Sequence, residues 1–343
     1  MATKGSRYIT FRDLASGRTP NGFVDHEVVD MVSQENPVLQ DVLWKQCNKG
    51  REDIVTIRSG LPEAVARAFY EGWFGTKSSK RQVANACCRV TTGIEFDWAL
   101  YDQDKDKAAF LTDEQKAHSS VLGDKVASLL FYGDLAGDPK GINGFAKTFS
   151  AYGTHTGAGM VTDDKKAEFY CLSAGGDGSA LRSIFLVGWG ANSAHGIYPE
   201  GTSAGIKIGQ LTKQFVQDAA GGNIEMGLQE MNWHAGLNIR DFRYCGRVCN
   251  IDIEDDPAGA GTADYTKLIR KLVTRVKSNG VTQRFYTSRL VFEAIAEQFE
   301  KKTQANAVKY ADLEQKKDAS LLGIPVAFCD CMNVDETAVS AAS

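Results

Sequence analysis

The first candidate for covalent chemistry is the segment Gly201–Gly205, which reads Gly-Thr-Ser-Ala-Gly. This pattern matches the nucleophile elbow of hydrolases, in which a strained turn between a strand and a helix exposes a serine. The residues that follow, Ile206-Lys-Ile208, alternate between apolar and polar as a strand does, not as a helix does. We therefore expect a glycine-rich loop here, and a serine hydrolase that uses Ser203 is kept as an alternative.

Four aspartates resemble a calcium-binding loop, because they stand at its first, third, fifth and twelfth positions: Asp102, Asp104, Asp106 and Asp113. The sixth position of such a loop should be glycine and is Lys107, and the twelfth should be glutamate. The sequence therefore predicts a solvated acidic connector here and no metal site.

Two cysteine pairs could in principle bind zinc, Cys245 with Cys249 and Cys329 with Cys331. Neither pair has the usual C-x-x-C spacing of a zinc site. On a strand, each pair only repeats on one face, so we expect buried thiols that behave as small apolar groups.

The remaining candidates for catalysis are isolated. The histidines show no metalloprotease spacing, the chain has no Walker loop, and Gly175–Gly178 is too short for a dinucleotide fingerprint. The sequence therefore predicts no catalytic residue, no cofactor and no metal, and the protein is not expected to be an enzyme.

Composition narrows the class of protein. Of 343 residues, 43% are hydrophobic and 24% are charged, which excludes wholesale disorder. The net charge of -4 argues against a dedicated nucleic-acid binder, which carries a basic excess. No apolar run approaches the roughly 18 residues of a membrane helix, so no membrane contact is expected. The N-terminus has no apolar signal core, and eight cysteines in so long a chain indicate free thiols in a reducing cytosol.

The sequence of residues 51–92 predicts two strands joined by a long connection. The segment Asp53–Arg58 alternates and is β-branched, and Gln82–Val90 can return as a second strand. The tip between them is rich in small and basic residues and carries Trp73 and Phe74. A loop this long is unusual inside a compact domain, so we expect a hairpin that projects and contacts something else.

Further along the chain, helices and strands mix without a regular βαβ alternation. A capping box at Thr112–Gln115 predicts a helix of about 20 residues that ends at Gly133. A buried strand is predicted at Arg182–Trp189. Helices from Tyr265 and from Thr287 or Ser288, with a short strand at Arg284–Tyr286 between them, lead to a last strand at Ile324–Phe328. This order predicts an α+β fold.

Charge is distributed unevenly between the predicted hairpin and the segment that follows it. Residues 41–90 carry nine Lys and Arg against five acidic residues, whereas residues 93–114 carry two Lys against seven acidic residues. A basic hairpin beside an acidic connector can pair between neighbouring copies of a chain. The candidate inter-subunit contacts are Arg58, Arg67, Trp73, Phe74, Lys77, Lys80 and Arg81, with Asp102, Asp104 and Asp106 as their counterparts.

Four motifs in this order point to a known family. They are Leu130–Asp134 (Leu-Phe-Tyr-Gly-Asp), Phe185–Gly190, Gly196–Gly201 and Leu321–Val326. Residues 1–40 have little core character and indicate an N-terminal arm. Together with this arm, the hairpin and the long helix, the motifs resemble the major capsid proteins of tailed bacteriophages with the Hong Kong 97-type fold, in the short-tailed-phage branch. The resemblance covers the chain from about residue 25 to about residue 335.

The resemblance implies a division into five parts. These are an N-terminal arm at 1–49, an extended loop at 50–92, a peripheral domain with a spine helix at 93–141, an axial domain with returns to the peripheral sheet at 142–320, and a closing strand with a C-terminal tail at 321–343.

The resemblance also implies a structural function. The chain would self-assemble into hexamers and pentamers of an icosahedral phage head around double-stranded DNA, in the virion after assembly in the host cytoplasm. One implied partner is a separate scaffolding protein, because only the short N-terminal arm precedes the extended loop. The others are a portal protein and, in some members, a decoration protein. Contact with the DNA would be non-specific. An encapsulin-like compartment shell, which shares the fold, is a second alternative.

Overall fold

The computed structural model describes residues 36–103, 106–153, 166–178, 180–217, 221–253, 264–301 and 320–342. The helices are α2 (Val38–Asp41), α3 (Trp98–Gln103), α4 (Lys107–Tyr132), α5 (Phe145–Thr148), α6 (Tyr265–Arg275) and α7 (Arg289–Lys301). The first strands are β1 (Trp44–Gln46), β2 (Glu52–Gly60), β3 (Ser79–Ala86), β4 (Cys88–Asp97), β5 (Ala151–Tyr152), β6 (Cys171–Ser173), β7 (Leu181–Trp189) and β8 (Ala194–Tyr198). The later strands are β9 (Ile206–Ile208), β10 (Thr212–Gln217), β11 (Asn223–Ile239), β12 (Cys245–Asp252), β13 (Thr282–Thr287), β14 (Ser320–Leu321), β15 (Ile324–Phe328) and β16 (Ser340–Ala341).

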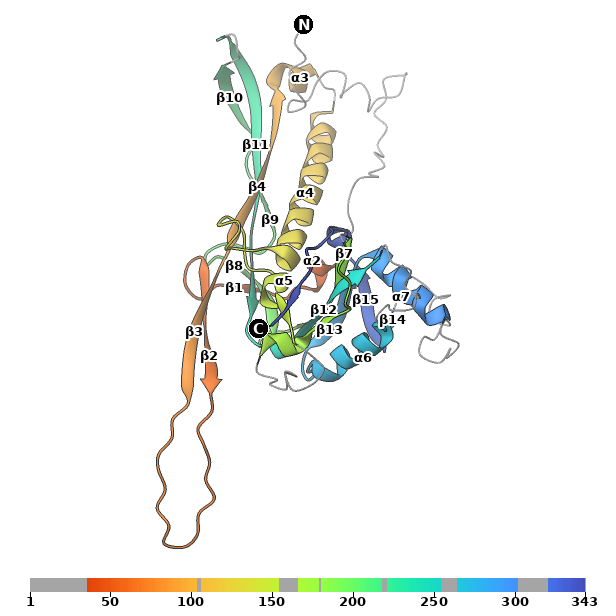
Figure 1. Ribbon diagram of the computed structural model, residues 1–343. Coiled ribbons are helices and arrows are strands. Elements are labelled where there is room, and N and C mark those ends of the chain that lie inside the picture. The colour runs from red at the N-terminus through yellow and green to blue at the C-terminus, as the bar shows by residue number, and fades with distance from the viewer. Residues whose placement is uncertain are drawn as a thin grey trace.

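Most strands join one twelve-stranded sheet whose main path runs β10-β11-β8-β7-β13-β15-β14. Antiparallel pairs such as β7 with β13 occur beside parallel pairs such as β13 with β15. The sheet and its helices confirm the predicted α+β class. The hairpin of β2 and β3 projects from one end of the molecule, while α3 and β10 lie at the other end (Figure 1).

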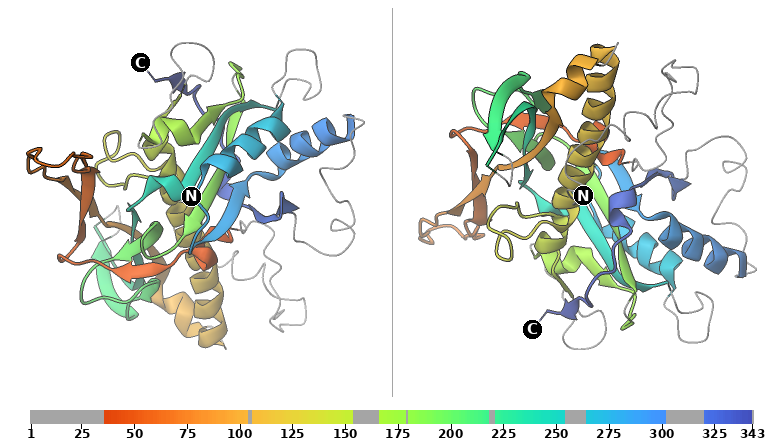
Figure 2. Two further views of the ribbon diagram at one scale, coloured as in Figure 1. Left: turned by 90° about the horizontal axis from the view of Figure 1, so that it is seen from below. Right: turned by 90° about the horizontal axis from the view of Figure 1, so that it is seen from above.

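The core is centred on β7, of which every residue is buried, as the continuous apolar run predicts. Helices cover both faces of this part of the sheet. A side chain at Gly246 of β12 would lie 2.6 Å from Leu272 of α6, so α6 packs closely on that face. The next residue, Arg247, points to the opposite face, where its guanidinium reaches the carbonyl of Phe149 just after α5. α6 and α7 lie together along one side of the sheet (Figure 2).

Helix α4 is longer than predicted because it begins at Lys107, five residues before the expected start at Thr112. The side chain of Asp106 caps it by accepting a hydrogen bond from the backbone N–H of Ala109 at 3.0 Å. The hydroxyl of Thr112 is not a cap, since it donates to the carbonyl of Ala108 inside the helix. The helix ends at Tyr132 before Gly133, as predicted.

Helix α4 lies along a long antiparallel ribbon formed by β4 and β11. Strand β11 spans seventeen residues and pairs with β4 over ten of them, from Met226 with Asp97 to Ala235 with Cys88. Aromatic rings join α3, α4 and β4, with Phe96 lying 5.4 Å from Phe110 and 5.2 Å from Tyr101 between ring centroids. These contacts explain why α4 begins early: Phe110 packs against the ribbon before the predicted cap is reached.

The hairpin is confirmed, but its return strand differs from the prediction. The expected strand Gln82–Val90 is divided at Cys87, because β3 pairs with β2 whereas β4 pairs with β11 in the large sheet. The C-terminal elements α6, β13, α7 and β15 agree with the predicted order. Among the described residues, no helix is both long and apolar enough to cross a membrane.

Candidate inter-subunit surface and buried polar clusters

The tip of the hairpin exposes apolar side chains. Beyond Gly60 the chain forms no strand until Ser79, and the side chains of this stretch do not pack on the rest of the subunit. Trp73 is 73% exposed and Phe74 is 94% exposed. Four further exposed apolar residues of the tip were not singled out from the sequence, although they share its composition: Leu61, Val65, Phe69 and Tyr70.

The basic candidates fall into two groups. Arg67 and Lys77 lie in the exposed tip, as expected. The predicted return strand begins at Gln82, which leaves Lys80 and Arg81 in the tip; this is wrong, because both belong to β3. There, Lys80 stands directly opposite Arg58 of β2, and like charges in such a cross-strand pair are unfavourable. An anionic partner would relieve this repulsion.

The acidic candidates are engaged within their own subunit. Asp102 accepts a hydrogen bond from the Lys107 ammonium at 2.6 Å, and this contact lowers the pKa of the Asp102 carboxyl. Asp106 caps α4, and Asp104 lies outside the described residues. α3 and the hairpin tip lie at opposite ends of the molecule, so any contact between them must join two copies (Figure 1).

A buried polar cluster holds the base of the hairpin on the large sheet. Asp53 of β2 is 3% exposed and accepts a hydrogen bond from the side chain of Asn238 in β11. The side chain of Asn85 in β3 donates to Asn238 at 3.0 Å. Arg240 adds a guanidinium nitrogen 3.7 Å from the Asp53 carboxylate. Both strands of the hairpin are therefore fixed to β11 through the same amide.

His195 of β8 completes this cluster and is fully buried, with Nε2 lying 3.9 Å from the Asp53 carboxylate. The pKa of this imidazole is lowered to about 4, mainly by burial and then by the nearby charges of Arg240 and Lys45, which together outweigh the opposite effect of Asp53. The ring is therefore neutral at pH 7. No sequence signal connects these residues, since they meet only when β2, β8 and β11 assemble.

In the part of the chain that the structure describes, neither Ser203 nor the cysteine pair of β12 belongs to a catalytic arrangement. Ser203 lies in a loop between Gly201 and Gly205, both with positive φ, and strand β9 follows where a nucleophile elbow requires a helix. Cys245 and Cys249 are buried in β12. Among the described residues, no group of three or more potential metal-ligating side chains gathers at one place.

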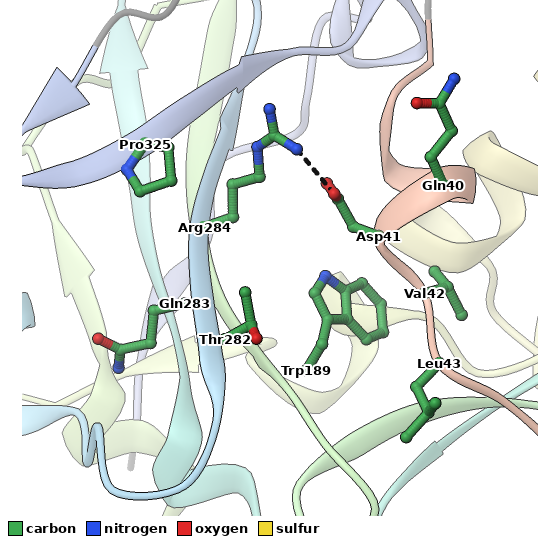
Figure 3. Close-up of a pocket in the computed structure, with 9 residues that line it drawn as sticks. All are labelled: Gln40, Asp41, Val42, Leu43, Trp189, Thr282, Gln283, Arg284 and Pro325. Carbon is green, nitrogen blue, oxygen red and sulfur yellow. Dashed lines mark hydrogen bonds and ion pairs between the residues drawn. The ribbon is translucent and has the colours of Figure 1, made fainter.

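A cavity of about 650 Å³ lies between α2, β13 and β15 (Figure 3). Its charged groups neutralise each other, because the Arg284 guanidinium lies 2.7 Å from the Asp41 carboxylate. Asp41 also accepts a hydrogen bond from the Tyr286 hydroxyl at 2.6 Å. This ion pair ties α2 to the sheet, and we assign no ligand to the cavity.

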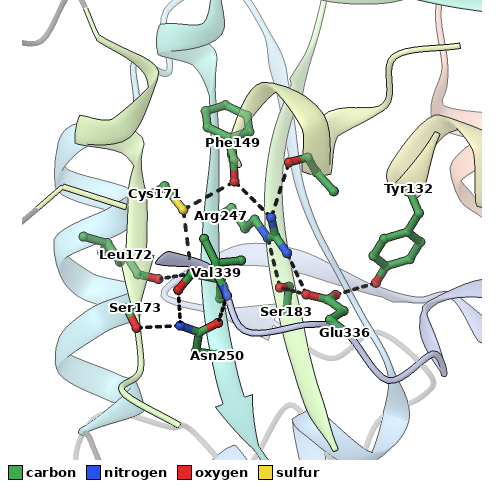
Figure 4. Close-up of polar contacts among 12 residues, drawn as sticks. Tyr132, Phe149, Cys171, Leu172, Ser173, Ser183, Arg247, Asn250, Glu336 and Val339 are labelled. Atoms are coloured by element: carbon green, nitrogen blue, oxygen red, sulfur yellow. Dashed lines mark hydrogen bonds and ion pairs between the residues drawn. The ribbon is translucent and has the colours of Figure 1, made fainter. Parts of the chain in front are cut away.

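A second buried polar cluster ties the C-terminal segment to the core (Figure 4). The Glu336 carboxylate lies 2.6 Å from the Arg247 guanidinium, and the two side chains are only 7% and 4% exposed. Glu336 also accepts hydrogen bonds from the hydroxyls of Tyr132 and Ser183. Further along, the side chain of Asn250 bonds both the N–H and the carbonyl of Val339.

Comparison with known proteins identifies the family of this chain. A family model described as major capsid protein GP7 matches residues 19–340. The chain belongs to this family of major capsid proteins. The expected function as a major capsid protein is thereby confirmed, and the family is one of structural proteins. No relative of this chain is found among curated proteins.

One solved structure shares the fold over its whole length. A chain of the near-atomic structure of bacteriophage Epsilon15 superimposes with a TM-score of 0.75 at 22% identity, and all of both chains is covered. This likeness confirms the expected Hong Kong 97-type fold. The bacteriophage JBD30 capsid has a TM-score of 0.47 at 10% identity, over 94% of this chain and 99% of that one. The SrpI encapsulin of Synechococcus elongatus has a TM-score of 0.42 at 11% identity, over 72% and 98%.

Proposed function

We propose that this capsid subunit self-assembles into the hexamers and pentamers of an icosahedral phage head that encloses double-stranded DNA. Membership of the major capsid protein family supports this proposal. The single observation that carries it is the projecting hairpin, whose tip leaves Trp73 and Phe74 largely exposed. Such a tip is a liability on a free monomer and gains its stability only when a neighbouring subunit covers it.

The strength of that contact follows from the apolar area at the tip. Covering Trp73 or Phe74 contributes about 1.5–3 kcal/mol for each ring. Contacts of this size are modest individually, but they are multiplied when many copies close into a shell. The basic residues of the hairpin, Arg58, Lys80 and Arg81, then face acidic residues of the neighbour, among which Asp102 is our candidate.

The proposal includes partners beyond the subunit itself. We expect a separate scaffolding protein during assembly in the host cytoplasm, a portal protein at one vertex and, where the shell needs reinforcement, a decoration protein. The packaged DNA is contacted only non-specifically, because the net charge of -4 gives the subunit no overall basic excess with which to bind phosphates. The finished subunit resides in the capsid of the virion.

The test is a double substitution at the tip, Trp73→Ser with Phe74→Ser, compared with Val121→Ser on α4. Val121 is 61% exposed, so the control removes an exposed apolar side chain outside the hairpin. Losing about 3 kcal/mol or more per contact lowers the association constant at least a hundredfold. We expect the double variant to fold with unchanged circular dichroism and melting temperature but to form no shells in electron micrographs.

Normal shells from the double variant, or from a chain lacking residues 66–80, would contradict the role of the hairpin. The particle contents test the rest of the proposal. Shells formed with the neighbouring phage genes should contain double-stranded DNA. Shells that consistently enclose a protein cargo and no DNA would instead identify an encapsulin-like compartment. A fluorophosphonate probe that labels Ser203 would support the hydrolase alternative.

A further inference from the structure

Two thiols face each other at the base of the hairpin. Cys47 follows β1 and precedes β2, whereas Cys87 lies in the link between β3 and β4. Their Sγ atoms are 3.4 Å apart although 40 positions separate them in the sequence. The pair therefore brackets the whole hairpin at the two points where it joins the rest of the subunit.

The backbone holds both thiols in position. The N–H of Cys47 donates to the carbonyl of Tyr198 at 2.8 Å, and the N–H of Cys87 donates to the carbonyl of Arg51 at 3.0 Å. A disulfide bond is about 2.0 Å long, so the two sulfur atoms must approach by about 1.4 Å from their 3.4 Å contact. Cys47 is buried and Cys87 is partly exposed, so an oxidant in solution can reach one of the two.

We propose that Cys47 and Cys87 are a redox-controlled staple, which closes into a disulfide in an oxidising medium and clamps the base of the hairpin. This inference rests on the geometry of the single subunit and holds whether or not shells form. The other contacts at this base are non-covalent, chiefly the hydrogen bonds made by the side-chain amides of Asn85 and Asn238. A covalent link would prevent the two connections from separating.

The oxidant is a small disulfide such as oxidised glutathione. The thiol of Cys87 loses its proton, and its sulfur attacks the small disulfide and displaces one glutathione thiolate. The deprotonated Cys47 then attacks the mixed disulfide and displaces the second thiolate. Two protein thiols are thereby oxidised to one disulfide, and one glutathione disulfide is reduced to two thiols that take up the two protons.

Burial raises the pKa of the Cys47 thiol and of the Cys87 thiol, so little thiolate exists at neutral pH. The rate of closure should therefore increase with pH above 7. A second close pair provides an internal comparison: the Sγ atoms of Cys171 and Cys249 are 3.8 Å apart, but both residues are fully buried. An oxidant cannot reach this pair while the subunit is folded.

The test oxidises the full-length chain in defined mixtures of reduced and oxidised glutathione at pH 8. Remaining thiols are blocked with N-ethylmaleimide, and tryptic peptides are analysed by mass spectrometry. We expect the peptide of residues 46–49 linked to that of residues 82–89. Because the second peptide also contains Cys88, the variant Cys88→Ala must keep the link, whereas Cys47→Ser and Cys87→Ser must lose it.

Hydrogen exchange tests whether the link clamps the hairpin. Amide exchange in β2 and β3 should become at least tenfold slower after oxidation of the wild-type chain and should not change in Cys47→Ser. The proposal is overturned if Cys47 and Cys87 remain free thiols, if the link runs through Cys88 or joins two chains, or if closure leaves the exchange rates unchanged.

Discussion

Replacing Glu336 by alanine should destabilise the subunit more than most single substitutions. The change removes the carboxylate that faces Arg247, whose side chain is 4% exposed. Arg247 keeps hydrogen bonds to the carbonyl of Phe149 at 2.9 Å and to the Ser183 hydroxyl at 3.0 Å, but neither partner carries a negative charge. A buried cation is therefore left uncompensated, and the hydroxyl of Tyr132 loses its acceptor.

The expected loss is about 3–5 kcal/mol in the free energy of unfolding, which is typical when one partner of a buried ion pair is removed. The adjacent Asp335 provides a matched control. Its side chain is 63% exposed and lies 3.5 Å from the Arg182 guanidinium. The Arg182 side chain is largely buried, but it keeps a 3.0 Å hydrogen bond to the side chain of Asn333 when Asp335 is removed. Because the Asp335 carboxylate lies mostly in solvent, where an ion pair is weak, Asp335→Ala should cost clearly less stability than Glu336→Ala.

Urea unfolding of unassembled subunits, followed by tryptophan fluorescence and circular dichroism, measures both changes. Hydrogen exchange locates them, because Glu336→Ala should release the segment that includes β16 before the rest of the subunit unfolds. If Glu336→Ala and Asp335→Ala lose equal stability, the buried pair does not hold the C-terminal segment, and our interpretation of the cluster fails.

Three other perturbations test separate parts of the structure. The pKa of His195 is about 4 in the folded subunit, below its unfolded value of about 6.5, so protons bind preferentially to the unfolded chain. The contribution of neutral His195 to the free energy of unfolding is fully present above pH 6.5 and should fall by about 3 kcal/mol as the pH drops to 4. The variant His195→Gln should therefore show a flatter profile of urea midpoint against pH in this range. Gly144→Ala would place a Cβ 2.7 Å from the carbonyl oxygen of Phe131 and should cost about 1–3 kcal/mol, whereas Gly72→Ala, with open space around it, should leave the melting temperature unchanged. Asp106→Ala removes the cap of α4 and should cost about 1 kcal/mol, with faster amide exchange confined to the first turn; equal exchange in both proteins would count against the cap.

Elements with strong local signals could be predicted from the sequence. The continuous apolar run of β7 and the helical spacing of α6 each depend on residues that are neighbours in the chain, and both elements lie where expected. The start of α4 was predicted wrongly because two capping sequences compete there. Asp106 caps the helix in place of Thr112, because the earlier start lets Phe110 pack on Phe96 of the ribbon.

The buried polar clusters could not be predicted, because their members are distant in sequence. Asp53 and Asn238 meet only after β2 is fixed beside β11, and no periodicity links their positions. The division of the return strand at Cys87 has a similar cause. Alternation along the chain indicates a strand, but the change of partner from β2 to β11 depends on the assembled sheet.

The structure indicates that apolar contacts contribute more than ion pairs to the affinity of the proposed interface. The sequence favours ion pairs between the basic hairpin and the acidic connector, yet Asp102 already binds Lys107 and Asp106 already caps α4. Exposed ion pairs contribute about 0–1 kcal/mol, whereas covering Trp73 contributes about 1.5–3 kcal/mol. The rings must therefore provide most of the affinity. We propose that the facing charges of Arg58 and Lys80 act chiefly by making an uncovered hairpin unfavourable and by selecting where on its neighbour it binds.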